Sequence, residues 1–264
     1  KTKAIIILHF AGYPCFVSDE LISLCKKKNI VIIEDVAHAP GAEIHKKKCG
    51  TIGDIGCFSF FSNKNISAGE GGLITTKNLI FEKQIRLLRS HGMNVLSLDK
   101  TKGRHANYDV LSPGFNYRID EIRSALAIIQ LEKLDKANQH RKNKVLFYKK
   151  LLKNTKISIP FSNIDKTIIS AYHIMPILLP KKINRNTIMR YLKNKGVQTS
   201  IHYPPFWSFT EYKNDFDINI FPNTREITSR ELTLPLFAKM NKKDIKFICD
   251  LLKDYLMMMI LSYR

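Results

Sequence analysis

The stretch that decides the fold runs from residue 30 to residue 76 and reads IVIIEDVAHAPGAEIHKKKCGTIGDIGCFSFFSNKNISAGEGGLITT. It holds three short apolar runs, at 30–33, 55–61 and 73–76, and such runs are typical of buried strands in a parallel sheet. Asp35 follows the first run, and Lys64 follows the second. Because α/β proteins bind ligands at the carboxyl ends of parallel strands, the stretch predicts an α/β fold with a ligand site at this edge.

The residues before this stretch extend the same pattern. An apolar run at 4–8 predicts another strand, and Ser18 followed by Asp19 and Glu20 predicts the start of a helix. Three lysines at 26–28 suit the end of that helix, because cations stabilise a helix C-terminus. A strand, a helix and a second strand in this order predict a β-α-β unit with parallel strands.

The polar residues at the strand ends suit one cofactor. A lysine amine such as that of Lys64 can form a Schiff base with an aldehyde, and an aspartate such as Asp35 can pair with a protonated pyridine nitrogen. The Ser59 hydroxyl can hold a phosphate, and the glycines at 69–72 let the backbone pass close to a planar group. These are the requirements of pyridoxal phosphate (PLP). The alternative is that these are solvated side chains at strand ends.

Four motifs resemble a known family, in the family's own order and over almost the whole chain. They are EDVAHAPGA (34–42), GDIGCFSFFSNKNISAGEGGLITT (53–76), LLRSHGM (87–93) and GFNYRIDEIRSALAIIQLEKL (114–134). They resemble the nucleotide-sugar aminotransferases of the DegT/DnrJ/StrS family. The resemblance implies the type I fold of PLP-dependent aminotransferases, with an incomplete large domain built on a mainly parallel sheet and a smaller α+β C-terminal domain.

The resemblance also implies roles for five residues. Lys64 is the catalytic Schiff-base lysine, and Asp35 is the partner of the pyridine nitrogen. Ser59 binds the cofactor phosphate, and Asn116 assists it from the neighbouring subunit of a homodimer. His38 stacks on the cofactor ring, although a hydrogen-bonded loop histidine is the alternative.

Three further residues near these positions have plainer interpretations. We expect Glu34 to be structural, and Tyr117 and Arg118 fit packing or helix capping as well as a role in the site.

The C-terminal half contributes a second group of expected site residues. No glycine or proline interrupts residues 119–159, which predicts a rigid helix leading from a large domain (1–133) into a small domain (134–264). The motif IHYPPFW (201–207) matches the family, and by resemblance His202 and Tyr203 face the substrate. A turn role for His202 stays open.

The resemblance implies a reaction and its partners. The expected activity is transfer of an amino group, usually from glutamate, to a keto group on a nucleotide-linked deoxysugar, for surface polysaccharide or glycan biosynthesis. Relatives with histidine in place of Lys64 dehydrate sugars, so the lysine favours amination over a dehydratase.

The N-terminus departs from the family. The family has a further portion before the strand at 4–8, with dimerising helices and a phosphate-binding loop. We therefore expect an incomplete copy, and a catalytically inactive remnant acting as a binding module is the alternative.

Composition sets the remaining bounds. The net charge of +20 permits a nucleic-acid partner, but the lysines are scattered and lack interleaved aromatic residues, so none is expected. Five cysteines without a CxxC pair argue against a disulfide scaffold or a metal site and favour a reducing cytoplasm. No apolar run reaches the roughly 20 residues that a membrane span needs.

Overall fold

A computed structural model describes residues 1–94, 108–213 and 216–262 of the chain. The chain divides into two compact units. Unit 1 comprises Lys1–Phe10, Pro14–Leu134 and Thr167–Ile169, and unit 2 comprises Ala11–Tyr13, Asp135–Lys166 and Ser170–Arg264. The expected domains, 1–133 and 134–264, stay a prediction, and they do not include the short segments that each unit takes from the other part of the sequence.

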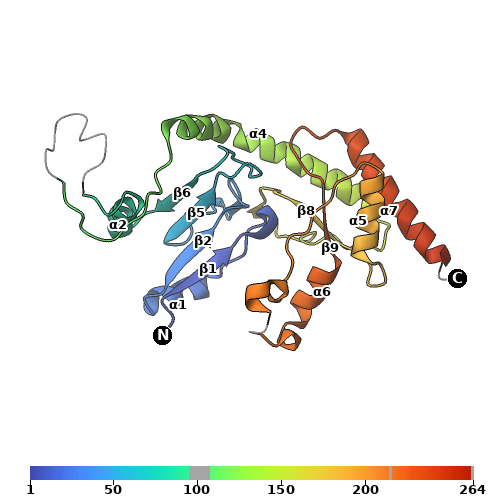
Figure 1. Cartoon of the computed structure of the whole chain (residues 1–264), viewed down its shortest axis with the longest axis horizontal. Helices are drawn as coiled ribbons and strands as arrows, with labels where there is room; N and C mark the ends of the chain where they lie inside the picture. Colours follow the sequence, from blue (N-terminus) through green and yellow to red (C-terminus); the bar gives the residue numbers. More distant parts are fainter. Residues whose placement is uncertain (95–107, 214–215, 263–264) are drawn as a thin grey trace. The chain divides into compact units, whose positions relative to one another are not determined.

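Unit 1 is built on a four-stranded sheet with the order β1-β2-β5-β6 (Figure 1). The strands are β1 (Ala4–Leu8), β2 (Val31–Asp35), β5 (Ile55–Ser59) and β6 (Gly72–Thr76). The first three run parallel, and β6 pairs antiparallel with β5. The sheet is therefore mainly parallel, as the sequence predicted.

Helix α1 (Asp19–Lys27) covers one face of this sheet. Its N-cap is Ser18, whose side chain accepts a hydrogen bond from the Leu21 N–H, as predicted. Cys25 of α1 packs with Ile7 of β1 and Ile32 of β2 in one buried cluster. The predicted β-α-β unit is thus confirmed, and burying this cluster is what fixes which face of β1 and β2 turns inward.

The described residues of unit 1 leave the opposite face of the sheet open. Ile6 and Leu8 alternate with buried Ile7 along β1 and are 68% and 48% exposed. Ile74 of β6, which the sequence predicted as part of a buried run, is 49% exposed. This is the face on which Asp35 lies, because Leu8 and Asp35 are register partners on parallel strands.

The described part of unit 1 also contains two further helices and a small sheet. Helix α2 (Leu79–Arg89) begins at the N-cap Asn78, and α4 (Glu121–Leu152) continues from unit 1 into unit 2. Leu134 of α4 packs with Phe60, Ile66 and Ala68. The small sheet, which the sequence did not predict, has the order β4-β3-β7 and consists of β3 (Glu43–Ile44), β4 (Lys47–Lys48) and β7 (Ile168–Ile169). The polar composition of residues 94–113 predicts a long loop, and this segment lies mostly outside the described residues.

Unit 2 surrounds a two-stranded antiparallel sheet of β8 (Met175–Leu178) and β9 (Glu231–Leu234). Its helices are α5 (Arg185–Asn194), α6 (Pro222–Arg230) and α7 (Lys242–Ser262), with short 3₁₀ helices at Phe206–Ser208, Thr210–Tyr212 and Ile218–Ile220. Met175 and Ile177 of β8, Leu232 and Leu234 of β9 and Leu252 of α7 are almost fully buried.

In this half the apolar run at 171–179 predicts a strand and the pattern at 244–256 predicts a helix, and the bounds of both need correction. The strand expected at 171–179 is confined to Met175–Leu178, because Ala171 and His173 donate their N–H groups to Gly12 and Ala11 instead of to a strand partner. The helix expected at 244–256 is longer and spans Lys242–Ser262. In the part of the chain that the structure describes, no helix combines the length and the apolar character needed to cross a membrane.

Candidate active site

The parallel strands of unit 1 bring the predicted polar residues to one edge of the sheet. Asp35 ends β2 and Ser59 ends β5, and Cys57 is the register partner of Asp35. Partners on parallel strands face the same way, and so do residues two apart on one strand. Asp35, Cys57 and Ser59 therefore lie on the same face, while Glu34 points to the other.

Asp35 is held with one carboxylate oxygen left open. Its Oδ1 accepts a hydrogen bond from the Ala37 N–H at 3.0 Å. Among the described residues, no hydrogen bond reaches Oδ2. The carboxylate is also close enough to act on Cys57, since burial together with the Asp35 charge raises the pKa of that thiol. Asp35 can therefore present a fixed negative charge to a group above the sheet.

Lys64 lies in a closed loop that follows β5. The Lys64 N–H donates to the Phe61 carbonyl at 2.9 Å, and Phe61 forms a bridge with Gly69. The side chain is half-buried, and this burial lowers the pKa of the Lys64 amine, while the nearby Asp35 charge partly opposes that shift. The structure thus brings the predicted lysine and the predicted aspartate within electrostatic reach of each other.

Ser59 and His38 are also positioned by local contacts. The Ser59 Oγ accepts the Phe61 N–H at 3.3 Å, which leaves the hydroxyl proton available for another acceptor. His38 is 6% exposed, and its ring centroid lies 6.1 Å from that of Phe10, tilted by 50°. A stacking role for His38 stays a prediction.

Together these residues fit PLP by the chemistry of their donors and acceptors. An amine with a lowered pKa, an open carboxylate oxygen and a free hydroxyl occupy one sheet edge. Two of the glycines at 69–72 also have close contacts within the protein, while the close approach to a planar group stays a prediction. A Cβ on Gly71 would lie 2.8 Å from Ile119 Cδ1, and one on Gly72 would lie 2.7 Å from the Phe58 carbonyl oxygen. These glycines thus permit close packing of the protein itself.

The remaining predicted residues lie elsewhere. Asn116 is exposed in unit 1, forms a bridge with Ser90, and accepts a hydrogen bond from Arg118 Nε at 3.3 Å. The Arg118 side chain thus has a partner within the protein, and its position requires no bound ligand. The expected phosphate contact of Asn116 across a dimer stays a prediction.

His202 and Tyr203 belong to unit 2, where hydrogen bonds account for His202. Its N–H donates to Glu231 Oε2 at 2.9 Å, and its Nδ1 lies 2.9 Å from Thr233 Oγ1. The Tyr203 ring meets the His202 ring edge-on at 4.8 Å. These contacts are compatible with the turn role that the sequence left open, and the substrate role stays a prediction.

Glu34 is the structural counterpart of Asp35 on the other face of the sheet. It is 1% exposed, and its two oxygens accept hydrogen bonds from His9 Nε2 at 3.0 Å and from the N–H groups of Gly50, Ile52 and Gly53 at 2.8 Å each. The predicted structural role of Glu34 is therefore confirmed. The sequence held no signal for these partners, because they lie far from Glu34 along the chain.

Cys49 completes a buried trio with His9 and Glu34, whose potential ligand atoms lie within 4.8 Å of one another. The atoms of His9 and Glu34 already take part in hydrogen bonds. His9 Nδ1 accepts the Cys15 N–H at 3.0 Å, so the proton on Nε2 is the one directed at Glu34. His9 and Glu34 therefore form a buried hydrogen-bonded pair beside the Cys49 thiol.

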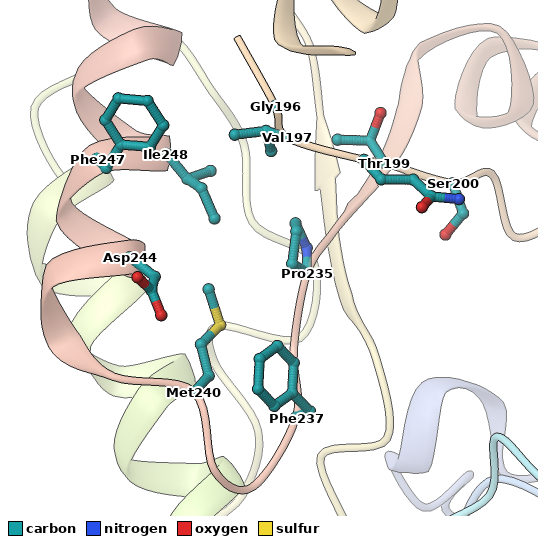
Figure 2. Close-up of a pocket in the computed structure, with 11 residues that line it drawn as sticks. Gly196, Val197, Thr199, Ser200, Pro235, Phe237, Met240, Asp244, Phe247 and Ile248 are labelled. Carbon is teal, nitrogen blue, oxygen red and sulfur yellow. The ribbon is translucent and has the colours of Figure 1, made fainter.

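A cavity of about 640 Å³ lies within unit 2, away from these groups in sequence. Figure 2 shows Asp244, Phe247 and Ile248 of α7 on one side of it and residues 196–200 on the other. None of the predicted site residues lines this cavity.

Comparison with known proteins gives concordant matches. The model of the DegT/DnrJ/EryC1/StrS aminotransferase family matches residues 1–253. The uncharacterized protein MJ1066 of Methanocaldococcus jannaschii is 34% identical, with 96% of this chain and 67% of the relative covered.

Two solved structures are similar as well. PseC of Helicobacter pylori, an aminotransferase involved in the biosynthesis of pseudoaminic acid, has a TM-score of 0.86 and 28% identity over 96% of this chain and 66% of its own. The putative sugar aminotransferase Spr1654 of Streptococcus pneumoniae has a TM-score of 0.84 and 28% identity over 95% of this chain and 68% of its own. The predicted fold type is confirmed, and the chain spans about two thirds of the length of these relatives.

Proposed function

Because the chain belongs to the DegT/DnrJ/EryC1/StrS aminotransferase family, we propose that it serves PLP-dependent transfer of an amino group to a nucleotide-linked keto-deoxysugar. The donor in this proposal is glutamate, and the product enters surface polysaccharide or glycan biosynthesis. The observation that carries the proposal is the half-buried Lys64 amine, whose pKa is lowered by burial and which interacts with Asp35 at the adjoining strand end.

Each residue at the sheet edge has a task in this proposal. PLP, when bound, supplies an aldehyde that condenses with amines and a ring that accepts electron density. The lowered pKa lets the Lys64 Nζ lose its proton more readily than an exposed lysine does, and the amine can then accept and return a proton at the substrate carbon. The open oxygen of Asp35 holds the proton on the ring nitrogen, and the Ser59 hydroxyl donates to the phosphate.

The residues outside this edge complete the proposal. His38 packs against the ring, and Asn116 reaches the phosphate from the second subunit of a homodimer. His202 and Tyr203 contact the sugar nucleotide. The resemblance to Spr1654, a putative sugar aminotransferase, and to PseC supports the sugar as the substrate class.

Dehydration of the sugar is the less favoured activity, because position 64, after the turn at Phe61, holds a lysine and not a histidine. An inactive chain that only binds a ligand remains the competing function.

The identity of the reactive lysine can be tested directly. The whole chain is incubated with PLP, reduced with borohydride, digested, and the modified lysines are mapped by mass spectrometry. We expect the modification to concentrate on Lys64, because burial makes its amine more nucleophilic than exposed lysines at neutral pH. Lys46→Ala, which removes an exposed lysine, serves as the control for Lys64→Ala.

Amino transfer is measured in parallel with glutamate and a keto-sugar nucleotide. Specific labelling of Lys64 with amino transfer supports the proposal, whereas labelling without transfer supports the binding-only function. Modification spread evenly over the exposed lysines, and unchanged in Lys64→Ala, would contradict both the site and the function.

A further inference from the structure

A second charged site lies in unit 2, in a recess where α5 begins and α6 ends. We call it the α5 recess, and it has a volume of about 520 Å³. Its lining residues are Lys181, Lys182, Ile183, Asn184, Arg185, Asn186, Ser229 and Arg230. Four of these are cations, and no carboxylate is among them.

The nearby acids do not neutralise this charge. Glu226 lies 3.5 Å from Lys181 and also pairs with Arg230, so a single carboxylate serves two cations. Among the described residues, no acidic side chain lies within ion-pair distance of Lys182 or Arg185. Two cations of the α5 recess thus lack an ion-pair partner from the described part of the chain.

Arg185 is fixed in place and retains unused donors. Its Nη1 donates to the backbone carbonyls of Thr228 and Glu231, which anchors the guanidinium to the end of α6 and the start of β9. The Glu231 carboxylate lies near enough to interact with the Arg185 charge, but its oxygens accept hydrogen bonds from the His202 N–H and the Thr233 hydroxyl and not from Arg185. The Nε of Arg185 is shielded from solvent, and no acceptor for it exists in the part of the chain that is described. The guanidinium is thus anchored by backbone carbonyls and has no carboxylate partner among the described residues, and an oxygen-rich anion in the recess is the group that would balance its charge.

The backbone adds further donors at the same place. Asn184 is the N-cap of α5, and its side chain accepts the Thr187 N–H at 3.1 Å. The amides of Arg185 and Asn186 belong to the first turn, where no intrahelical acceptor is available. The partial positive charge of the helix N-terminus therefore adds to the four cations.

From these observations, we propose that the α5 recess is a binding site for a small phosphate-bearing anion. Lys181 and Lys182 supply mobile charge at the rim, and Arg185 supplies planar donors at the wall. The volume exceeds that of a single phosphate many times over, since one water occupies about 30 Å³. The recess therefore suits a diphosphate or a phosphorylated metabolite better than a lone inorganic ion. It shares no residue with the Lys64 site, so the two proposals stand or fall separately.

Calorimetric titration of the whole chain with inorganic pyrophosphate, at constant ionic strength, tests this proposal. We expect saturable binding with a dissociation constant below about 1 mM, and Lys181→Gln with Lys182→Gln should weaken it about tenfold or more. The matched control is Lys193→Gln with Lys195→Gln, which removes the same charge from the other end of α5, about 15 Å away. That control should change the affinity by less than about twofold.

Two further variants distinguish the α5 recess from general charge attraction and from the cofactor site. Arg185→Lys keeps the charge but removes the planar donors, so it should weaken pyrophosphate binding. Because the Nη1 bonds to the Thr228 and Glu231 carbonyls are lost as well, its affinity is compared with that of the wild type well below its lowered unfolding midpoint. Ser59→Ala should have no effect on pyrophosphate affinity, because Ser59 belongs to the expected cofactor site.

Three results would overturn the proposal. The first is an absence of saturable pyrophosphate binding, and the second is equal weakening by the two lysine pairs, which would indicate nonspecific attraction. The third is tight binding of a single-stranded oligonucleotide through Lys181 and Lys182 without pyrophosphate binding, which would make the recess part of a nucleic-acid surface.

Discussion

Replacing Glu34 by glutamine should locally destabilise unit 1 by a large and calculable amount. The carboxylate accepts four hydrogen bonds, two at each oxygen, from His9, Gly50, Ile52 and Gly53. Glutamine keeps one acceptor oxygen and turns an NH₂ group toward the other two donors. Each lost bond to a buried carboxylate is worth about 1.5–3 kcal/mol, so the two together should cost about 3–6 kcal/mol.

The alkylation rate of the Cys49 thiol, which lies near Glu34, measures this local loss of stability. Cys49 is 2% exposed, and burial together with the Glu34 charge raises the pKa of its thiol to about 12, so alkylation requires the structure to open. A cost of about 3–6 kcal/mol should accelerate Cys49 alkylation roughly 10²- to 10⁴-fold, because each 1.4 kcal/mol is a factor of ten. Mass spectrometry measures the labelling of each cysteine separately.

The same molecule contains its own reference. Cys249 in unit 2 is 0% exposed and likewise has a thiol pKa raised by burial to about 12, so its labelling rate should stay unchanged in Glu34→Gln. Glu70→Gln, at an exposed position, is the control substitution. Equal rates at Cys49 in the wild type and in Glu34→Gln would refute the reasoning, and so would equal acceleration at both cysteines.

Acidity provides a second readout of the same prediction. Burial alone would raise the pKa of Glu34, but the hydrogen bonds from His9, Gly50, Gly53 and Ile52 outweigh it and hold the pKa below its ordinary value of 4.5. The stabilisation is therefore fully present above pH 4.5 and is lost as the pH falls through the folded-state pKa. Cys49 protection in the wild type should decline in this acid range, whereas Glu34→Gln should lack that decline.

Three other predictions address the site, the sheet and the helix start. Asp35→Asn should still take up PLP but lose most amino transfer, because a neutral amide cannot keep the ring nitrogen protonated; near-normal turnover would remove Asp35 from the proposed role. Ile7→Ala should cost about 2–5 kcal/mol of unfolding free energy and Ile6→Ala less than about 0.5 kcal/mol, since only Ile7 is buried. Similar losses for the two in denaturant titrations would mean that a further layer covers the open face. Ser18→Ala should cost about 1 kcal/mol through loss of the Leu21 cap, while Ser23→Ala on the exposed side of α1 should not destabilise.

The predictable parts of this fold are those that depend on short-range patterns. The apolar run before Asp35 and the cap at Ser18 predicted β2 and α1, because strand burial and helix capping involve nearby residues. The uninterrupted stretch at 119–159 predicted α4 for the same reason. At the site, the alternation of side chains along β2 placed Asp35 and Glu34 on opposite faces.

The remaining parts depend on partners far along the chain. The small sheet joins Glu43 to Ile169, and no local pattern marks two-residue strands. The shorter β8 results from hydrogen bonds between Ala171 and Gly12, which no window of neighbouring residues contains. The exposure of Ile74 depends on whether another segment packs on its face of the sheet, and the composition of the strand does not specify such packing.

The chain alternates between its two units, and this affects whether the units can be separated by cleavage or expressed as fragments. It passes from one unit to the other between residues 10 and 11, 13 and 14, 134 and 135, 166 and 167, and 169 and 170. A protease cut after Leu134 would leave β7 on the C-terminal fragment, although β7 pairs with β3 of the N-terminal one. The same cut would leave Ala11 and Gly12 on the N-terminal fragment, although they accept hydrogen bonds from His173 and Ala171. Each fragment would thus carry away a segment of the other's structure, so neither half can be expressed as a complete piece by dividing the gene at a single codon.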